Sequence, residues 1–211
     1  MKITIQNQNF ILHHFGAVFW ESKSILLISD VHLGKVSHFR KHGIAIPSEA
    51  IIENFSRMDL LIAEFQPKTI IFLGDLFHSV QNIEFDLFAN WTKLLTQTII
   101  LVKGNHDIIN GFFFEELNIE VVNELIIEDF ILTHHPLEDN FLFNFCGHIH
   151  PGIKIRGKGR QFLNISCFFR KPDQMILPSF GEFTGNFYLE PTKNDLVYGI
   201  TPDEVFQVVL K

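Results

Sequence analysis

The first part of the chain alternates short apolar runs with polar turns. The runs KITIQ, NFILH, GAVFW and SILLIS are separated by NQN, HFG and ESK, a pattern that predicts four short strands. A helix is predicted from Ser48 to Phe65, where apolar residues recur at helical spacing: Ile51, Ile52, Phe55, Met58, Leu61, Ile62 and Phe65. Two buried strands, TIIFLG and TIILVKG, follow, with a second helix predicted between them over Glu84–Leu95.

The second half of the chain consists mainly of predicted strands. NELIIED, FILTHH, FLFNFCGHIH, RQFLNISC and NFYLEP are joined by short turns, and the tail ITPDEVFQVVLK fits a last strand. Apolar strands that lead directly into turns are typical of sheets covered on both faces. We therefore expect an α/β fold in which two mixed sheets pack together with helices outside, formed by residues 1–211 as one domain.

Residues able to bind metal follow five of the apolar runs. In LVKGNHDIIN, the apolar run ends at Gly104 and is followed by Asn105, His106 and Asp107. The other four runs end in the same way: at Asp30 and His32, at Asp75, at His134 and His135, and at His148 and His150. Ligands of open α/β sheets bind outside the carboxyl ends of the strands, so we expect these side chains to form a single site.

The residue types of this site indicate a pair of divalent metal ions. Carboxylate, imidazole and amide oxygen suit Mn²⁺, with Fe²⁺ and Zn²⁺ as alternatives, and no strand ends in a thiolate that would favour a structural zinc. The ligands are too numerous for one ion. They fit two ions about 3.5–4 Å apart that share a carboxylate, a centre that turns a bridging water into hydroxide and holds a phosphoryl group.

Each segment has an ordinary structural explanation when it is taken alone. A single aspartate at the end of a strand usually caps a turn or a helix, and His134 and His135 fit an ordinary turn. GHIH is harder to explain in this way, because alternation places His148 and His150 on the same face of an extended segment. The agreement of five segments favours a metal site over five separate turns.

The five segments together resemble a known superfamily. DVHLGK, LGDLFH, GNHD, THHP and GHIHP, in this order between Asp30 and Pro151, resemble the motifs of the calcineurin-like metallophosphoesterases. The resemblance implies a four-layer α/β/β/α sandwich with a dinuclear centre at its rim. It also implies hydrolysis by attack of metal-bound hydroxide on phosphorus.

The resemblance gives each motif residue a role. Asp30, His32 and His150 would bind the first metal, and Asp75 would bridge both metals. The second metal would be bound by Asn105, His134 and His148, with His135 as a substitute ligand or a substrate contact. His106 would protonate the leaving oxygen or stabilise the phosphoryl charge, and Asp107 would orient it.

A closer resemblance begins at the first motif. DVHLGKVSHFRKHGIAIP, together with GHIHPGI, is similar to the bacterial PdeM-type proteins named ligase-associated DNA damage response endonucleases. This resemblance implies a phosphodiesterase or nuclease, a place in DNA repair, and DNA ligase and helicase as partners.

Charge bears on the substrate. The chain carries a net charge of −7, which argues against nucleic-acid binding by its whole surface. Two basic clusters nevertheless adjoin the motifs, and from them we predict the substrate contacts Lys35, Arg40, Lys41, Arg156 and Lys158. Basic residues beside a metal centre suit a polyanion such as DNA or RNA. The second cluster, KIRGKGR, also fits a solvated hairpin edge.

Other readings stay open. A phosphatase or pyrophosphatase acting on a small nucleotide or a nucleotide-lipid would use the same metals, and GFFFEEL and NFLFNFC could line a lipid groove or form core strands or a short helix. A non-catalytic scaffold would have lost ligands, and none is missing here.

With no secretory signal, no membrane-spanning run and only two cysteines, we expect a cytoplasmic protein with reduced thiols. Exposed Phe-rich strands would favour a homodimer.

Overall fold

A computed structural model describes residues 1–36, 49–78, 83–107, 111–138, 141–156, 159, 161–181 and 184–209. Its first sheet has seven strands in the order of the chain. They are β1 (Lys2–Ile5), β2 (Gln8–Leu12), β3 (Val18–Trp20), β4 (Ile25–Ile28), β5 (Thr69–Leu73), β6 (Thr98–Val102) and β7 (Ile119–Val122). The first four strands pair antiparallel, and β4 to β7 pair parallel. A 3₁₀ turn, η1 (Glu21–Lys23), joins β3 to β4.

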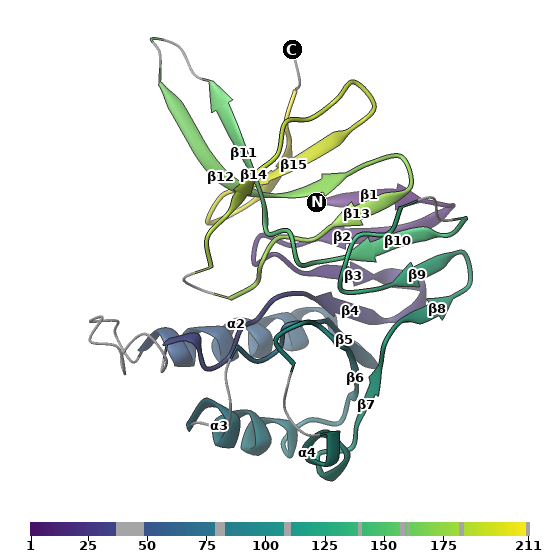
Figure 1. Ribbon diagram of the computed structural model, residues 1–211, viewed down its shortest axis with the longest axis vertical. Helices are drawn as coiled ribbons and strands as arrows, with labels where there is room; N and C mark the ends of the chain where they lie inside the picture. Colours follow the sequence, from purple (N-terminus) through teal and green to yellow (C-terminus); the bar gives the residue numbers. More distant parts are fainter. Residues whose placement is uncertain are drawn as a thin grey trace.

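The second sheet has nine strands in a less regular order. They are β8 (Leu125–Ile127), β9 (Phe130–Leu132), β10 (Phe143–Cys146), β11 (Pro151–Arg156), β12 (Phe162–Arg170), β13 (Gln174–Ile176), β14 (Phe187–Tyr188), β15 (Leu196–Ile200) and β16 (Val205–Gln207). The parallel pairs β9–β10 and β10–β13 lie in its body. The antiparallel hairpin β11–β12 projects away from the two stacked sheets (Figure 1).

Strand alternation divides the apolar residues between two main cores. On β4, Leu26 and Ile28 face the helices, whereas Ile25 and Leu27 face the second sheet. The inter-sheet core is closed from the other side by Phe143 and other residues of β9, β10, β12 and β13. Continuous apolar runs thus belong to strands that are covered on both faces.

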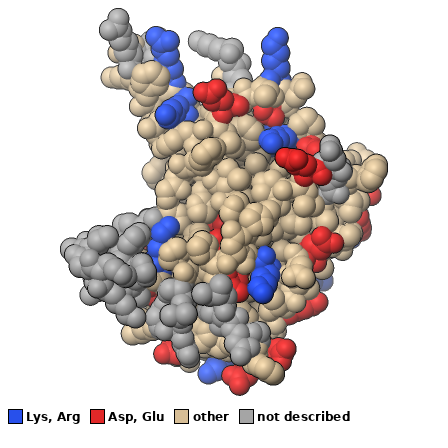
Figure 2. Space-filling view, in the orientation of Figure 1, with Lys and Arg blue, Asp and Glu red and all other residues tan. Residues whose placement is uncertain are grey.

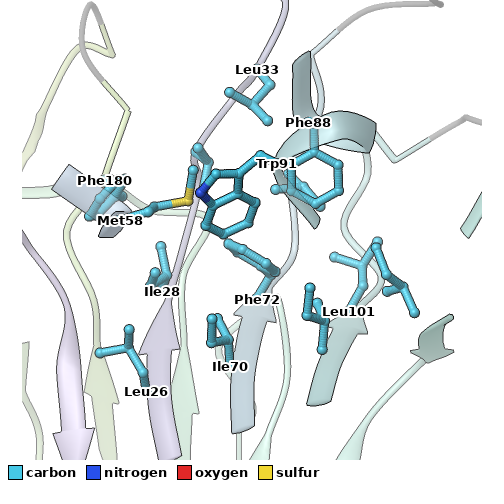
Figure 3. Close-up of a cluster of buried hydrophobic side chains, with 14 of the residues drawn as sticks. Leu26, Ile28, Leu33, Met58, Ile70, Phe72, Phe88, Trp91, Leu101 and Phe180 are labelled. Carbon is cyan, nitrogen blue, oxygen red and sulfur yellow. The ribbon is translucent and has the colours of Figure 1, made fainter. Parts of the chain in front are cut away.

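Three helices lie on the outer face of the first sheet: α2 (Glu49–Phe65), α3 (Ile83–Thr92) and α4 (Gly111–Glu116) (Figure 1). Met58 of α2 and Phe88 and Trp91 of α3 pack on Ile70 and Phe72 of β5 (Figure 3). The indole nitrogen of Trp91 donates a hydrogen bond to Asp59 over 2.7 Å, which ties α3 to α2. α2 ends where Gln66 adopts a left-handed conformation, with φ of 45°, before Pro67.

The sequence-based prediction of two packed mixed sheets with flanking helices is confirmed. In the described residues, all three helices cover the first sheet. The outer face of the second sheet carries a third apolar cluster, which includes Cys146, Cys167 and Ile176. GFFFEEL forms the short helix α4, in which Phe114 is buried and Phe112 is exposed, and NFLFNFC places Phe143 and Phe145 in the inter-sheet core. No helix in the described part of the chain is long and apolar enough to span a membrane.

Candidate metal centre

The polar residues predicted to form one site come together where the carboxyl ends of parallel strands from both sheets meet. Parallel pairing of β4, β5 and β6 brings their ends to one edge, and parallel pairing of β9 and β10 does the same in the second sheet. Two hydrogen bonds from backbone N–H groups join the loops. Gly147 N–H donates to the carbonyl of His134 over 3.0 Å, and His148 N–H donates to the Asp30 carboxylate over 3.0 Å. Residues more than a hundred positions apart therefore share one rim.

The first group of ligand atoms comes from Asp30, His32 and His150, which lie within 4.8 Å of one another. The Nε2 atoms of His32 and His150 are 3.2 Å apart, and His150 Nε2 lies 3.2 Å from Asp30 Oδ1. Asp30 and His32 are buried. Three ligand atoms that converge in this way can hold one cation.

The second group comes from His134, His135 and His148, again within 4.8 Å. His134 Nε2 lies 3.2 Å from His148 Nδ1, and His135 Nε2 lies 2.6 Å from Asn105 Oδ1. His134 is fixed from behind, because its Nδ1 lies 2.9 Å from the carbonyl oxygen of Leu73. That contact leaves its Nε2 directed toward the centre.

Asp75 lies between the two groups. Its Oδ2 is 4.0 Å from His32 Nε2, and its Oδ1 is 3.4 Å from His134 Nε2. The same Oδ1 accepts a hydrogen bond of 2.9 Å from the backbone N–H of His106. A buried carboxylate that reaches both groups has the placement of a bridging ligand.

The protonation states of the buried groups suit a divalent cation. Burial lowers the pKa of His32 to about 3, and it also lowers the pKa values of His135 and His148. Burial alone would raise the pKa of Asp30, but its contact with His150 and a hydrogen bond from Ser29 outweigh that effect and lower it. Neutral imidazoles beside charged carboxylates are the forms that bind metal. Among the described residues, the buried Asp30 Oδ1 atom has no hydrogen-bond partner, an orphaned state that a bound cation would relieve.

The backbone is strained at the ligands. Asp30, His32, Asp75, His148 and His150 all have positive φ, between 48° and 69°. Non-glycine residues rarely adopt this region, and each one costs of order 1–3 kcal/mol. Strain gathered on five ligands is typical of a functional site whose surroundings hold it in place.

Glycines give the ligands room. A Cβ on Gly74 would overlap the His134 ring, and a Cβ on Gly104 would overlap Asp75. A Cβ on Gly147 would overlap Ser29 Oγ and the Asp30 carboxylate. Gly74 and Gly147 therefore allow close approach of the two sheets at the centre, and Gly104, expected from the sequence to end a strand, allows the loop after β6 to approach Asp75.

Several supporting residues were not anticipated from the sequence. The buried side-chain amide of Asn144 donates to Thr133 Oγ1 over 2.8 Å, and its oxygen accepts from Leu137 N–H over 3.1 Å. It thereby ties together the two ends of the loop that carries His134. Ser29 donates to the Asp30 carboxylate over 2.5 Å, and Ser179 donates to the Asp30 carbonyl over 2.9 Å. The signals were present only as single polar residues within or beside apolar runs.

His106 lies at the open side of the first group. Its exposed ring is 5.9 Å from His32 and 4.9 Å from His78, measured between ring centroids. His78, the last residue of LGDLFH, was not among the predicted site residues. Asp107 is buried and accepts hydrogen bonds from the backbone N–H groups of Gly104 and Phe77, over 2.9 and 3.2 Å. It thus holds the loop that carries His106.

The predicted substrate contacts are only partly within the described residues. Lys35 follows the first motif and is half-buried, and this burial lowers its pKa. Arg156 is exposed at the end of β11. Arg40, Lys41 and Lys158 lie outside the described residues. A hollow of 410 Å³ is lined by Ser179, which donates to the Asp30 carbonyl, and by residues that include His14, Arg57, Ser166 and Asn186.

Comparisons with known proteins agree with this geometry. A family model described as calcineurin-like phosphoesterase matches residues 23–166. The crystal structure of the nuclease MPE from Pseudomonas putida is similar over 99% of this chain and 99% of that chain, with 29% identity and a TM-score of 0.84. No curated protein matches the chain.

Two other solved structures are less similar. A protein of unknown function from Aquifex aeolicus has 21% identity and a TM-score of 0.44, over 60% of this chain and 78% of that chain. The E. coli phosphoesterase Yfce has 14% identity and a TM-score of 0.44, over 85% and 88%. The chain belongs to the calcineurin-like phosphoesterase family and is a metal-dependent phosphoester hydrolase.

Proposed function

We propose that this protein hydrolyses phosphodiester bonds of nucleic acid at a centre of two divalent metal ions. The observation that carries the proposal is the position of Asp75, whose two carboxylate oxygens reach the two separate groups of imidazoles. A single-ion site would need only one of these groups.

The ligand sets follow from the two groups. Asp30, His32 and His150 would hold one ion, and Asp75 would bridge it to the other. The second ion would be held by Asn105, His134 and His148, with His135 close enough to replace Asn105. Oxygen and imidazole donors without thiolate favour Mn²⁺, and Fe²⁺ or Zn²⁺ also fit them.

When bound, the two ions polarise the phosphoryl group and supply an activated water for in-line displacement. The remaining steps belong to side chains. His106, on a loop fixed by Asp107 and with its ring 5.9 Å from that of His32, would give a proton to the leaving oxygen. Lys35 adds positive charge near Asp30, where it would offset the charge of the phosphate.

A nucleic-acid substrate is supported by two observations. The similar protein from Pseudomonas putida is described as a nuclease. Cationic side chains also lead away from the centre on β11. A role in DNA repair beside DNA ligase and helicase is proposed from the motif resemblance alone. The free, buried thiols of Cys146 and Cys167 fit the cytoplasmic location expected from the sequence.

The test compares a small aryl phosphodiester with the matched phosphomonoester, using protein loaded with Mn²⁺. Asp75→Asn is the active-centre variant, and Asp86→Asn, on the exposed side of α3, is the control. We expect diester hydrolysis that is lost in Asp75→Asn and kept in Asp86→Asn. Hydrolysis of the monoester alone would overturn the phosphodiesterase assignment and favour a small-molecule phosphatase.

A further inference from the structure

The projecting hairpin of β11 and β12 presents two faces of different character. In their register, Lys154 pairs with Asn164 and Arg156 pairs with Phe162, so these four side chains share one face. Tyr188 of β14 pairs with Gly152 and joins the same face. We call Lys154, Arg156, Phe162, Asn164 and Tyr188 the wing face. The opposite face carries Ile153, Ile155 and Ile165, which pack into the third apolar cluster.

The wing face is cationic and aromatic. Lys154 Nζ lies 5.0 Å from the centroid of the Tyr188 ring, and Phe162 is 66% exposed. The strands β11, β12 and β14 contain no acidic residue, in a chain whose net charge is −7. Lys and Arg side chains stand out on this hairpin at the top of the molecule (Figure 2). Such a surface suits a polyanion that also has flat rings to stack.

The wing face begins at the metal centre. β11 starts at Pro151, directly after the candidate ligand His150, and the backbone N–H of Phe187 donates to the His150 carbonyl over 2.9 Å. Along one face of β11, Lys154 and Arg156 are spaced by about 7 Å. At the base of the hairpin, Ser166 and Asn186 line the same hollow as Ser179, which donates to the Asp30 carbonyl. The wing face is therefore joined to the centre through the segment that carries His150.

We propose that the wing face binds the nucleic-acid strand that enters the metal centre. This inference rests on the proposed function, since it names a surface used by the same substrate. Lys154 and Arg156 contact backbone phosphates, and Tyr188 and Phe162 stack on bases. Phosphate contacts position the strand without reading its sequence. The surface therefore raises affinity for a strand and leaves the chemistry on a small diester unchanged.

The test uses the double variant Lys154→Gln/Arg156→Gln. Its matched control is Lys68→Gln/Lys93→Gln, which removes two exposed charges. These two lysines lie in the segments before β5 and β6, whereas the metal centre lies at the carboxyl ends of these strands. Binding of a labelled single-stranded oligonucleotide is measured by fluorescence anisotropy, with chelator present and over a range of salt. Hydrolysis of the small aryl diester is measured in parallel with Mn²⁺.

We expect the wing variant to bind the oligonucleotide about tenfold more weakly, with a shallower salt dependence, and to hydrolyse the small diester at the wild-type rate. A third variant, Phe162→Ser, should weaken binding without changing the salt dependence. Equal binding by the wing variant and its control would overturn the inference.

The binding assay separates this inference from the proposed function. Oligonucleotide that binds through the wing face but is never cleaved would leave the surface in place and refute the nuclease activity. If Phe162→Ser instead changes the molecular mass in solution and leaves binding unaltered, the wing face is an interface between two copies, and the inference is wrong.

Discussion

The Nε2 atoms of His32 and His150 lie 3.2 Å apart, although the two residues are 118 positions apart in the chain. Burial keeps His32 neutral, with a pKa of about 3, and Asp30 Oδ1 lies 3.2 Å from the same His150 nitrogen. Two imidazole nitrogens and a carboxylate oxygen thus converge on one position. Without a cation, these desolvated polar groups and the strained backbone around them oppose folding.

Metal binding should therefore stabilise the fold. At a free Mn²⁺ concentration about a hundredfold above the Kd, binding to the native state adds about 2.7 kcal/mol per site. Two sites together add about 5 kcal/mol, so for a chain of this length we expect the Tm to fall by about 10–20 °C on chelation and to recover when Mn²⁺ is added. Differential scanning fluorimetry measures this shift. An unchanged Tm across the titration would contradict a metal centre in this position.

Replacing His106 with alanine separates chemistry from metal binding. The side chain is exposed and belongs to neither convergent group, so His106→Ala should retain the wild-type metal content. Loss of a general acid should lower turnover of the diester by about 10²- to 10⁴-fold. Elemental analysis and single-turnover kinetics measure the two quantities. Turnover at the wild-type rate in the metal-loaded variant would remove His106 from the mechanism.

Gly147→Ala tests the close approach of the two sheets. The added Cβ would overlap Ser29 Oγ and the Asp30 carboxylate, so the loop that carries His148 must move. We expect a loss of about 1–3 kcal/mol in unfolding free energy, and a lower metal content. Gly185→Ala is the matched control, because its Cβ would meet nothing within 4 Å. Denaturant unfolding of both variants is the measurement, and equal stability would show that the sheets can separate without cost.

His13 should make stability depend on pH away from the metal centre. Burial, and then the neighbouring His14, lower the pKa of His13 from 6.5 to about 4. The unfolded chain therefore binds the additional proton first, and stability falls as the pH drops from 6.5 toward 4. Solvent screening at this partly exposed site keeps the difference below about 3 kcal/mol.

The variant His13→Asn isolates this effect. An asparagine oxygen can accept the hydrogen bond that Phe15 N–H gives to His13 Nδ1, so the turn should be kept. In chelator, denaturant unfolding between about pH 7 and about pH 4.5 should show a smaller loss of stability for the variant than for the wild type. Parallel curves for the two proteins would contradict the assignment.

The sequence predicted the strands that are long and apolar, because these are buried on both faces and leave an unbroken pattern. It predicted the convergence of five strand ends for the same reason, since parallel pairing brings carboxyl ends to one edge. Short strands such as β7, β13 and β15 were missed, because three to five residues are too few to show a clear period, whether their exposure is mixed as in β7 or all are buried as in β13.

The residues that support the metal ligands could not be predicted from the pattern of apolar and polar residues alone. The contacts of Asn144 with Thr133 and Leu137 depend on how the second sheet folds back on itself. The motif led us to expect that Asp107 orients the His106 side chain. In the structure, the Asp107 carboxylate accepts hydrogen bonds from the backbone N–H groups of Phe77 and Gly104. Ligands such as Asp30 and Asp75 have positive φ. Sequence alone does not predict this conformation for a residue other than glycine, because such residues rarely adopt it.

The most direct test of the two-ion centre is a stoichiometric titration of metal-free protein with Mn²⁺, in which diester hydrolysis is followed at each addition. With Asp75 as a bridge between two ions, activity should stay low through the first equivalent and rise with the second, and Asp75→Asn should bind fewer ions and remain inactive. Full activity at one equivalent, or a fully active Asp75→Asn variant, would contradict the account.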